Sequence, residues 1–161
     1  MPVFGLNNGT VPIVAFNYGA RKPERMRKTI RYSITTAICI MTAGTLLFHA
    51  MPDKLLAIFD ASEEMLRIGK PALRIISLSF PIAGFCIGST SVFQALGYSV
   101  YSMIVSIVRQ LAVLVPCAYV IGRLTGSVTM VWWAFVIAEL VSLALCLTFY
   151  RKVDRYVIRA M

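Results

Sequence analysis

Hydrophobic side chains fill four long segments of this chain, and most of its charged residues gather in the short stretches between them. A helix needs about 20 predominantly apolar residues to cross a bilayer. Four segments have that length: residues 32–51, 75–96, 100–121 and 130–150. The pattern therefore predicts four full transmembrane helices.

Two shorter apolar segments predict further helices. Residues 3–18 are too short for a full span and contain Pro12, so we expect a broken helix that forms the later part of a longer span. Between the first two full spans, an apolar cluster lies among charged residues, as in a short helix at the membrane interface. Its members are Leu55, Leu56, Ile58 and Phe59.

The overall composition agrees with a membrane protein. The hydrophobic fraction is 58%, the charged fraction is 14% and the mean hydropathy is +0.76, whereas a soluble domain has about 25% charged residues. We therefore predict an all-α, polytopic membrane helix bundle. It would contain four full transmembrane helices, a partial N-terminal helix and an interfacial helix.

The net charge of +9 would favour nucleic acid as a partner in a soluble protein. Here most basic residues lie in two clusters, within residues 21–31 and 151–159, and each cluster adjoins an apolar span. This distribution argues against nucleic acid and favours anionic membrane lipids as the partner.

The same charges predict the orientation in the membrane. Residues 19–31 and 151–161 hold ten basic and two acidic residues, whereas residues 52–74 and 122–129 hold five basic and four acidic ones. Cytoplasmic loops carry the excess of lysine and arginine. We therefore expect a multi-pass protein of the inner, cytoplasmic membrane, with the basic loop and the C-terminus in the cytoplasm.

The sequence contains no pattern typical of an enzyme or a metal protein. The four cysteines are far apart, none belongs to a Cys-x-x-Cys pair, and the single histidine is His49. No phosphate-binding loop of the Gly-x-x-x-x-Gly-Lys type occurs. We therefore predict no catalytic residue, no metal site and no cofactor.

Glu139 is the first candidate for a binding residue, because it is the only acidic residue inside a predicted span. A carboxylate at mid-bilayer is destabilising unless it is paired or protonated. Trp132 and Phe135 share its helix face, and a carboxylate beside aromatic rings suits an organic cation. The alternative is a structural carboxyl that bonds to a neighbouring helix.

Four other polar residues have two interpretations each. Arg109 would either pair with Glu139 and pack within the bundle or contact the substrate. Asn7 and Asn8 would satisfy the backbone of the broken helix or line a cavity. Gln94 would line the cavity or tie helices together.

A stripe of small residues at helical spacing lies in the second full span. Its members are Gly84, Gly88, Ser91 and Ala95. Small residues let two helices approach closely. We interpret the stripe as a packing surface rather than a binding site.

Five stretches carry a family resemblance in sequence order. They are residues 5–28, residues 55–64, Phe93-Gln-Ala-Leu-Gly97, Arg109-Gln-Leu with Pro116, and Trp132-Trp-Ala-Phe with Ala138-Glu139. These stretches resemble the end of helix eight with its following loop, the outer loop between helices nine and ten, and parts of helices ten, eleven and twelve of a multidrug and toxic compound extrusion (MATE) transporter. Among bacterial members, the resemblance is nearest to the staphylococcal multidrug exporters.

The resemblance implies that residues 1–161 form the C-terminal part of a twelve-span antiporter, from the end of helix eight to helix twelve. The N-terminal lobe is then missing, and Met1 is an internal methionine. Such a protein exports small organic cations or drugs, driven by a gradient of H+ or Na+. Sodium-driven members carry an acid on helix ten, whereas residues 75–96 contain none, which favours proton coupling or an ion site in the N-terminal lobe.

Two alternatives to this function remain open. One is a flippase of the same superfamily that moves lipid-linked or polysaccharide substrates, for which we expect a larger and more cationic cavity than Arg109 alone supplies. The other is a membrane accessory subunit that transports nothing.

Overall fold

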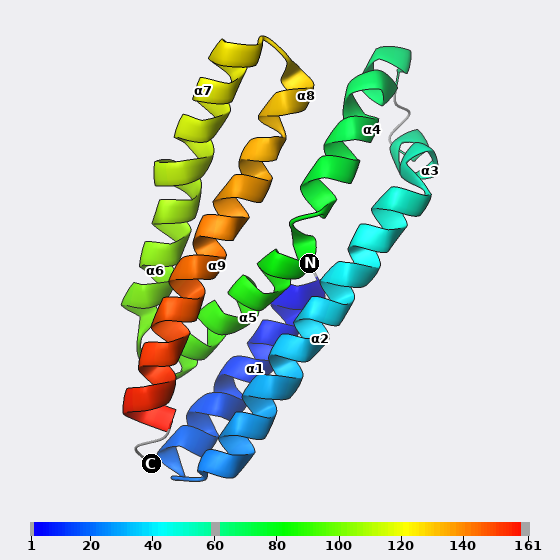
Figure 1. Cartoon of the computed structure of the whole chain (residues 1–161). Coiled ribbons are helices and arrows are strands. Elements are labelled where there is room, and N and C mark those ends of the chain that lie inside the picture. The colour runs from blue at the N-terminus through cyan, green and yellow to red at the C-terminus, as the bar shows by residue number, and fades with distance from the viewer. Residues whose placement is uncertain (1, 59–61, 159–161) are drawn as a thin grey trace.

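The computed structural model describes residues 2–58 and 62–158, and every regular element within these ranges is a helix (Figure 1). In chain order they are α1 (Pro2–Gly19), α2 (Pro23–Ala50), α3 (Pro52–Ala57), α4 (Glu63–Ser77), α5 (Phe80–Ala95), α6 (Ser99–Ile107), η1 (Val108–Leu114), α7 (Val115–Thr125), α8 (Val128–Val131), α9 (Trp133–Val153) and η2 (Asp154–Ile158), where η denotes a π-helix. The prediction of an all-α chain is confirmed.

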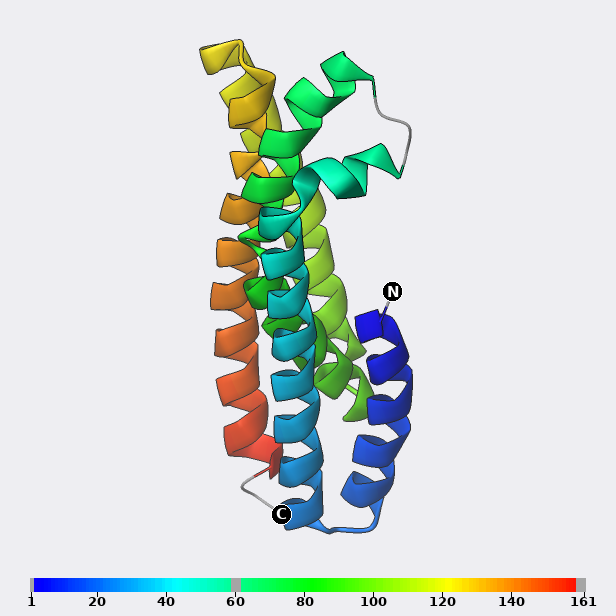
Figure 2. The ribbon, with the colours of Figure 1, turned by 90° about the vertical axis from the view of Figure 1, so that its right-hand side faces the viewer.

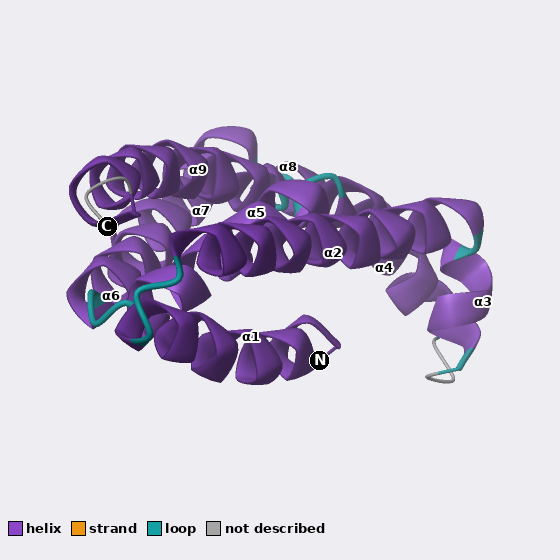
Figure 3. Cartoon of the chain, turned by 90° about the horizontal axis from the view of Figure 1, so that it is seen from below, coloured by secondary structure: helices purple, strands orange, loops and turns teal. Residues whose placement is uncertain are grey.

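The central helix of the bundle is α5. It packs against α1, α2, α6 and α9. The long hairpin from α6 to α9 runs along one flank of α5, and α1 and α2 run along the other (Figure 1). Seen from below, α1 and α9 lie at opposite edges of the molecule (Figure 3).

Within residues 2–58 and 62–158, three helices are long and apolar enough to cross a membrane: Pro23–Ala50, Ser99–Thr125 and Val128–Ile158. They contain the predicted spans at 32–51, 100–121 and 130–150, apart from the last residue of the first. The predicted span at 75–96 is built differently, because α4 and α5 meet there at a bend of 52°. Taken together as one broken span, these two helices make the fourth crossing.

Pro81 explains the break between α4 and α5. Proline has no N–H, so the carbonyl of Ser77, four residues earlier, loses its helical donor. Thr45 on α2 supplies a replacement, since its Oγ1 donates to the Ser77 oxygen at 2.8 Å. Ser79 Oγ donates to the Ile76 oxygen at 2.7 Å. The bend is therefore held by side-chain hydrogen bonds from α2 and from the bend itself.

The first helix corrects one expectation, because α1 continues through Pro12 as a single helix and is not broken there. Its neighbours hold it in place where proline removes one backbone bond. A buried hydrogen bond of 2.8 Å joins Thr10 Oγ1 to Ser33 Oγ on α2. The packing of α1 against α2 and α5 thus keeps the helix continuous.

The short helix expected after the first full span is present as α3. Leu56 is buried and its side chain lies against Gly69 on α4. An ion pair between Lys70 and Asp53 also joins α4 to α3. Phe59, which belongs to the predicted apolar cluster, lies outside the described residues.

The small-residue stripe on α5 is a packing surface, as predicted. A Cβ atom added at Gly84 would lie 3.0 Å from the backbone oxygen of Ala37 on α2, and one added at Gly88 would lie 3.0 Å from Ile34 Cγ1. Backbones that approach so closely leave no room for larger side chains. The stripe therefore sets the distance between α5 and α2.

One end of the bundle brings distant parts of the sequence together (Figure 2). A core cluster there includes residues of α1, α2, α5, α9 and η2. The guanidinium of Arg27 donates to the backbone oxygen of Ile158 at 3.2 Å, so η2 is attached to the beginning of α2. The two basic segments of the sequence consequently lie at the same end of the molecule.

Candidate functional site

The candidate site is built around an ion pair between two membrane-spanning helices. Arg109 on η1 donates from Nη1 to Oε1 of Glu139 on α9, at 3.0 Å. The Arg109 side chain is 32% exposed and that of Glu139 is 12% exposed. The structure thus contains the Arg109–Glu139 pair that the sequence suggested. Each of the two charged side chains, which would be destabilising alone in an apolar span, is thereby neutralised by the other.

The ion pair leaves part of the carboxylate unused. Glu139 Oε2 is buried and has no hydrogen-bond partner within the described part of the chain. The indole N–H of Trp132 is in the same situation. Buried polar atoms without partners are uncommon in folded proteins and call for an explanation. Glu139 on α9 thus has an acceptor, and Trp132, the residue directly before α9, has a donor, with unused hydrogen-bonding capacity.

A cavity of about 240 Å³ opens beside the ion pair. Its lining comes from η1 and α9 and consists of Arg109, Gln110, Leu114, Phe135, Ala138 and Glu139. The rings of Trp132 and Phe135 lie 6.3 Å apart between centroids, tilted by 30°. A carboxylate, a guanidinium and an aromatic side chain therefore share one cavity, and a second aromatic ring lies next to Phe135.

The helix that carries Arg109 is locally a π-helix. Residues Val108–Leu114 form η1, between α6 and α7. π-Helical turns are rare and are found frequently at functional sites. Here the wider turn contributes Arg109, Gln110 and Leu114 to the cavity, so the irregular segment of the span is also the segment that forms the candidate site.

The other sequence candidates lie apart from this cavity. Asn7 on α1 is half-buried, and its Oδ1 has no partner among the described residues. Asn8 on α1 and Gln94 on α5 are exposed. None of the three lines the cavity beside Glu139. Their roles as cavity-lining or helix-tying residues remain predictions.

Sequence reasoning missed part of the cavity wall. Gln110, Leu114 and Ala138 line it together with the predicted residues. Gln110 could have been singled out, because it is a polar residue next to Arg109 inside a span. Leu114 and Ala138 carry no signal of their own, since apolar residues fill every span of this chain.

Comparisons with known proteins agree on one family. The MatE family model matches residues 1–120. Multidrug export protein MepA of Staphylococcus saprophyticus is 26% identical over 95% of this chain and 34% of its own length. MepA of Staphylococcus aureus strain MSSA476 is 24% identical with the same coverage. The chain spans about a third of the length of the curated relatives it matches.

Solved structures give the same result for the fold. An inward-facing MATE family multidrug resistance transporter of the MOP superfamily superposes with a TM-score of 0.88 at 22% identity, over 98% of this chain and 37% of that one. The MATE multidrug transporter DinF-BH has a TM-score of 0.87 at 30% identity, over 98% of this chain and 35% of that one. The family match over most of the chain and the shared helical fold lead to one assignment. This chain, a multi-pass membrane protein, belongs to the MatE family of multidrug efflux transporters.

Proposed function

We propose that this chain is the C-terminal lobe of a drug exporter, from the end of helix eight to helix twelve of the twelve-span family architecture. Two observations support this assignment. The five resembling stretches occur in the family order, and the chain matches about a third of the length of each full relative. The N-terminal lobe would then form the opposite wall of the transport pathway.

The proposed substrates are small organic cations or drugs. The observation that carries this proposal is the cavity in which Glu139, with one carboxylate oxygen free, lies beside Phe135. Negative charge next to an aromatic face attracts organic cations. A planar aromatic dye with a fixed positive charge, such as ethidium, combines both features that the cavity would recognise and is therefore a suitable first probe.

The ion pair gives the site a way to couple binding to movement. A cation that enters the cavity competes with Arg109 for the Glu139 carboxylate, so binding weakens the link between η1 and α9. At about 240 Å³ the cavity is smaller than the roughly 300–1,000 Å³ of a site for a drug-sized ligand. A second lobe would enlarge it to a complete site.

The proposed energy source is an ion gradient of H+ or Na+. No acidic residue occurs between residues 75 and 96, which supports proton coupling or an ion site on the other lobe. In the proposed orientation, the basic loop after α1 and the C-terminal segment face the cytoplasm, because these segments hold most of the lysines and arginines.

A chimera tests the proposed function. Residues 1–161 would replace the corresponding third of Staphylococcus saprophyticus MepA, and ethidium efflux from cells would be compared with that of this chain alone and of the remaining two thirds alone. We expect efflux from the chimera and none from either part. Glu139→Gln in the chimera should lower efflux per folded molecule, because the amide removes the negative charge.

Two results would contradict the proposal. A chimera that inserts and folds but does not transport would rule out the lobe assignment. Unchanged efflux per folded molecule after Glu139→Gln would return Glu139 to a structural role.

A further inference from the structure

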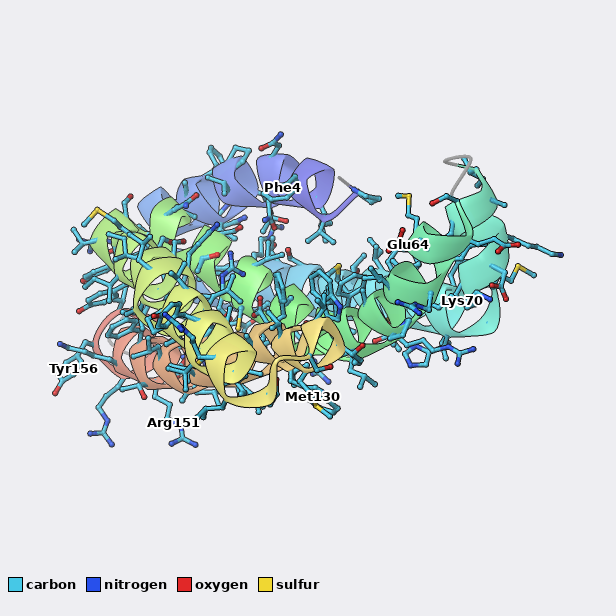
Figure 4. All side chains as sticks on the ribbon, turned by 90° about the horizontal axis from the view of Figure 1, so that it is seen from above. Phe4, Glu64, Lys70, Met130, Arg151 and Tyr156 are labelled. Carbon is cyan, nitrogen blue, oxygen red and sulfur yellow. The ribbon has the colours of Figure 1, made fainter. Side chains whose placement is uncertain are left out.

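A second cavity lies where α9 passes into η2, and it shares no lining residue with the cavity beside the ion pair. It has a volume of about 490 Å³ and is lined by Arg151, Lys152, Asp154, Arg155 and Tyr156. Three basic side chains and one acidic one therefore surround a single hollow. Figure 4 shows Arg151 and Tyr156 projecting outward from this edge of the bundle. The candidate transport site uses none of these residues.

An aromatic column adjoins the basic cavity. The rings of Tyr101 and Phe149 are stacked with centroids 4.5 Å apart, and the rings of Tyr98 and Tyr101 are stacked at 5.5 Å. The ammonium of Lys152 lies 5.8 Å from the centroid of the Tyr101 ring. A cation–π contact of this kind favours one position for the lysine. At least one basic side chain of the cavity is thus positioned by the fold.

A smaller cavity of about 100 Å³ shares Lys152 and Tyr156 with the first. It lies between the tyrosines and the end of α9, and its lining also includes Tyr98 and Tyr101. Tyrosines are enriched where a membrane protein meets the headgroup layer, because the ring is apolar and the hydroxyl is polar. The basic hollow and the tyrosines together match the boundary between lipid headgroups and acyl chains.

The segment that carries the basic side chains, the end of α9 and η2, is packed into the core of the bundle. Val153 is 2% exposed and Ile158 is 1% exposed, so both belong to the core. Arg27 on α2 donates to the Ile158 carbonyl at 3.2 Å. The basic side chains therefore project from a fixed surface and not from a loose tail.

We propose that this basic hollow, with its tyrosine wall, is a binding site for the phosphate headgroup of an anionic phospholipid such as phosphatidylglycerol. Arg151 and Arg155 bind the phosphate oxygens. Lys152, whose ammonium lies over the Tyr101 ring, adds a third positive charge that attracts the phosphate. The tyrosines contact the glycerol and upper acyl region. The site requires only that this end of the bundle lies at a headgroup layer, and it does not depend on the proposed transport activity.

Native mass spectrometry of the delipidated chain in non-ionic detergent tests the proposal. The probes are short-chain phosphatidylglycerol, short-chain phosphatidylcholine and inorganic phosphate. We expect a clear preference for phosphatidylglycerol. The double variant Arg151→Gln/Arg155→Gln should lower the affinity for phosphatidylglycerol by about tenfold or more, because each basic residue near an anionic lipid surface contributes to the free energy of binding. Arg151→Lys/Arg155→Lys should keep most of the preference.

A matched control separates a site from a general charge effect. Arg25→Gln/Arg31→Gln removes the same charge from exposed positions of α2 that do not line the hollow, and it should lower the affinity by less than about twofold. Helical circular dichroism verifies that every variant is folded. Equal losses in both double variants, equal affinity for the two lipids, or full displacement of the lipid by inorganic phosphate would each overturn the proposal.

Discussion

At the residue scale, the site depends on how Arg109 and Glu139 compensate one another. Each would be destabilising alone inside an apolar span, and each has the other as its charged partner at 3.0 Å. Removing one member of a buried pair destabilises more than removing both, because a single change strands an uncompensated charge. The interaction energy between Arg109 and Glu139 can therefore be measured by comparing the single changes with the double change.

We expect Glu139→Gln to lower the free energy of unfolding of residues 1–161 by about 2 kcal/mol, less than for a fully buried pair because Arg109 is partly exposed. The double change Arg109→Gln/Glu139→Gln should be milder than the sum of the single changes. Thermal unfolding in detergent measures these effects in a double-mutant cycle.

Arg123→Gln is the matched control for the arginine change, because Arg123 is exposed and its ring contact is with Tyr119 on its own helix. It should change stability by less than about 0.5 kcal/mol. Strictly additive effects of the Arg109 and Glu139 changes would show that the two residues do not interact.

At the element scale, the close contact between α5 and α2 is the feature most sensitive to side-chain size. The backbone of α2 at Ala37 and Ile38 lies 3.0–3.2 Å from where a Cβ at Gly84 would be. Backbone atoms cannot rotate away as a side chain can. A single added methyl group must therefore push the two helices apart.

Gly84→Ala is expected to lower the unfolding temperature of the chain in detergent, with a loss of about 1–3 kcal/mol, which is typical of overpacking. Gly44→Ala on α2 is the control, because its new Cβ would meet only Phe80 Cδ2 at an ordinary 3.7 Å. The overpacking argument fails if the two variants melt at the same temperature.

The helices themselves were largely predictable from the sequence, but their irregularities were not. Apolar runs located the spans because a bilayer demands about 20 such residues whatever their order. The bend before Pro81 was missed, since its stability depends on Thr45, a residue of another helix. The continuity of α1 through Pro12 was missed for the same reason, because neighbouring helices hold it.

The candidate site was predictable only in part. Glu139 and Arg109 stood out because charged residues are rare in spans, and their pairing followed from their inferred depths. The π-helix at Val108–Leu114 left no trace in the hydrophobic pattern, because apolar residues surround it on every side. Gln110 could have been singled out as a polar neighbour of Arg109, but without that segment the contribution of Leu114 to the cavity could not be inferred.

At the scale of the whole molecule, the fold gathers positive charge at one end. Arg27 bonds to the end of η2, so the loop after α1 and the C-terminal segment meet (Figures 1 and 2). The opposite end carries α3, α4 and the turn before α8, and Glu64 and Lys70 lie there (Figure 4). This polarity is the physical basis for an orientation in the membrane.

Single cysteines at Arg25, Arg155 and Glu64, each in a background without the four native cysteines, test the orientation. All three positions are exposed. A membrane-impermeant maleimide should label Glu64→Cys in intact cells and should label the other two only after permeabilisation. Labelling of Arg25→Cys in intact cells would reverse the proposed topology.

The π-helix has a consequence for how the chain tolerates changes in length. An α-helix turns by about 100° per residue, so the wide turn at Val108–Leu114 shifts the rotational phase between α6 and α7. A π-helical turn accommodates about one residue more than an α-helical turn does, so deleting one residue there would let an ordinary α-helix form and would leave α6 and α7 close to their present orientations. A one-residue deletion within α6 or α7 has no wide turn to absorb it, and it would rotate the parts of the span on either side by about 100° relative to one another. One of the two contact faces, α6 on α5 or α7 on α9, would then point away from its partner. The π-helix is therefore the part of this span in which a one-codon deletion disrupts the packing least.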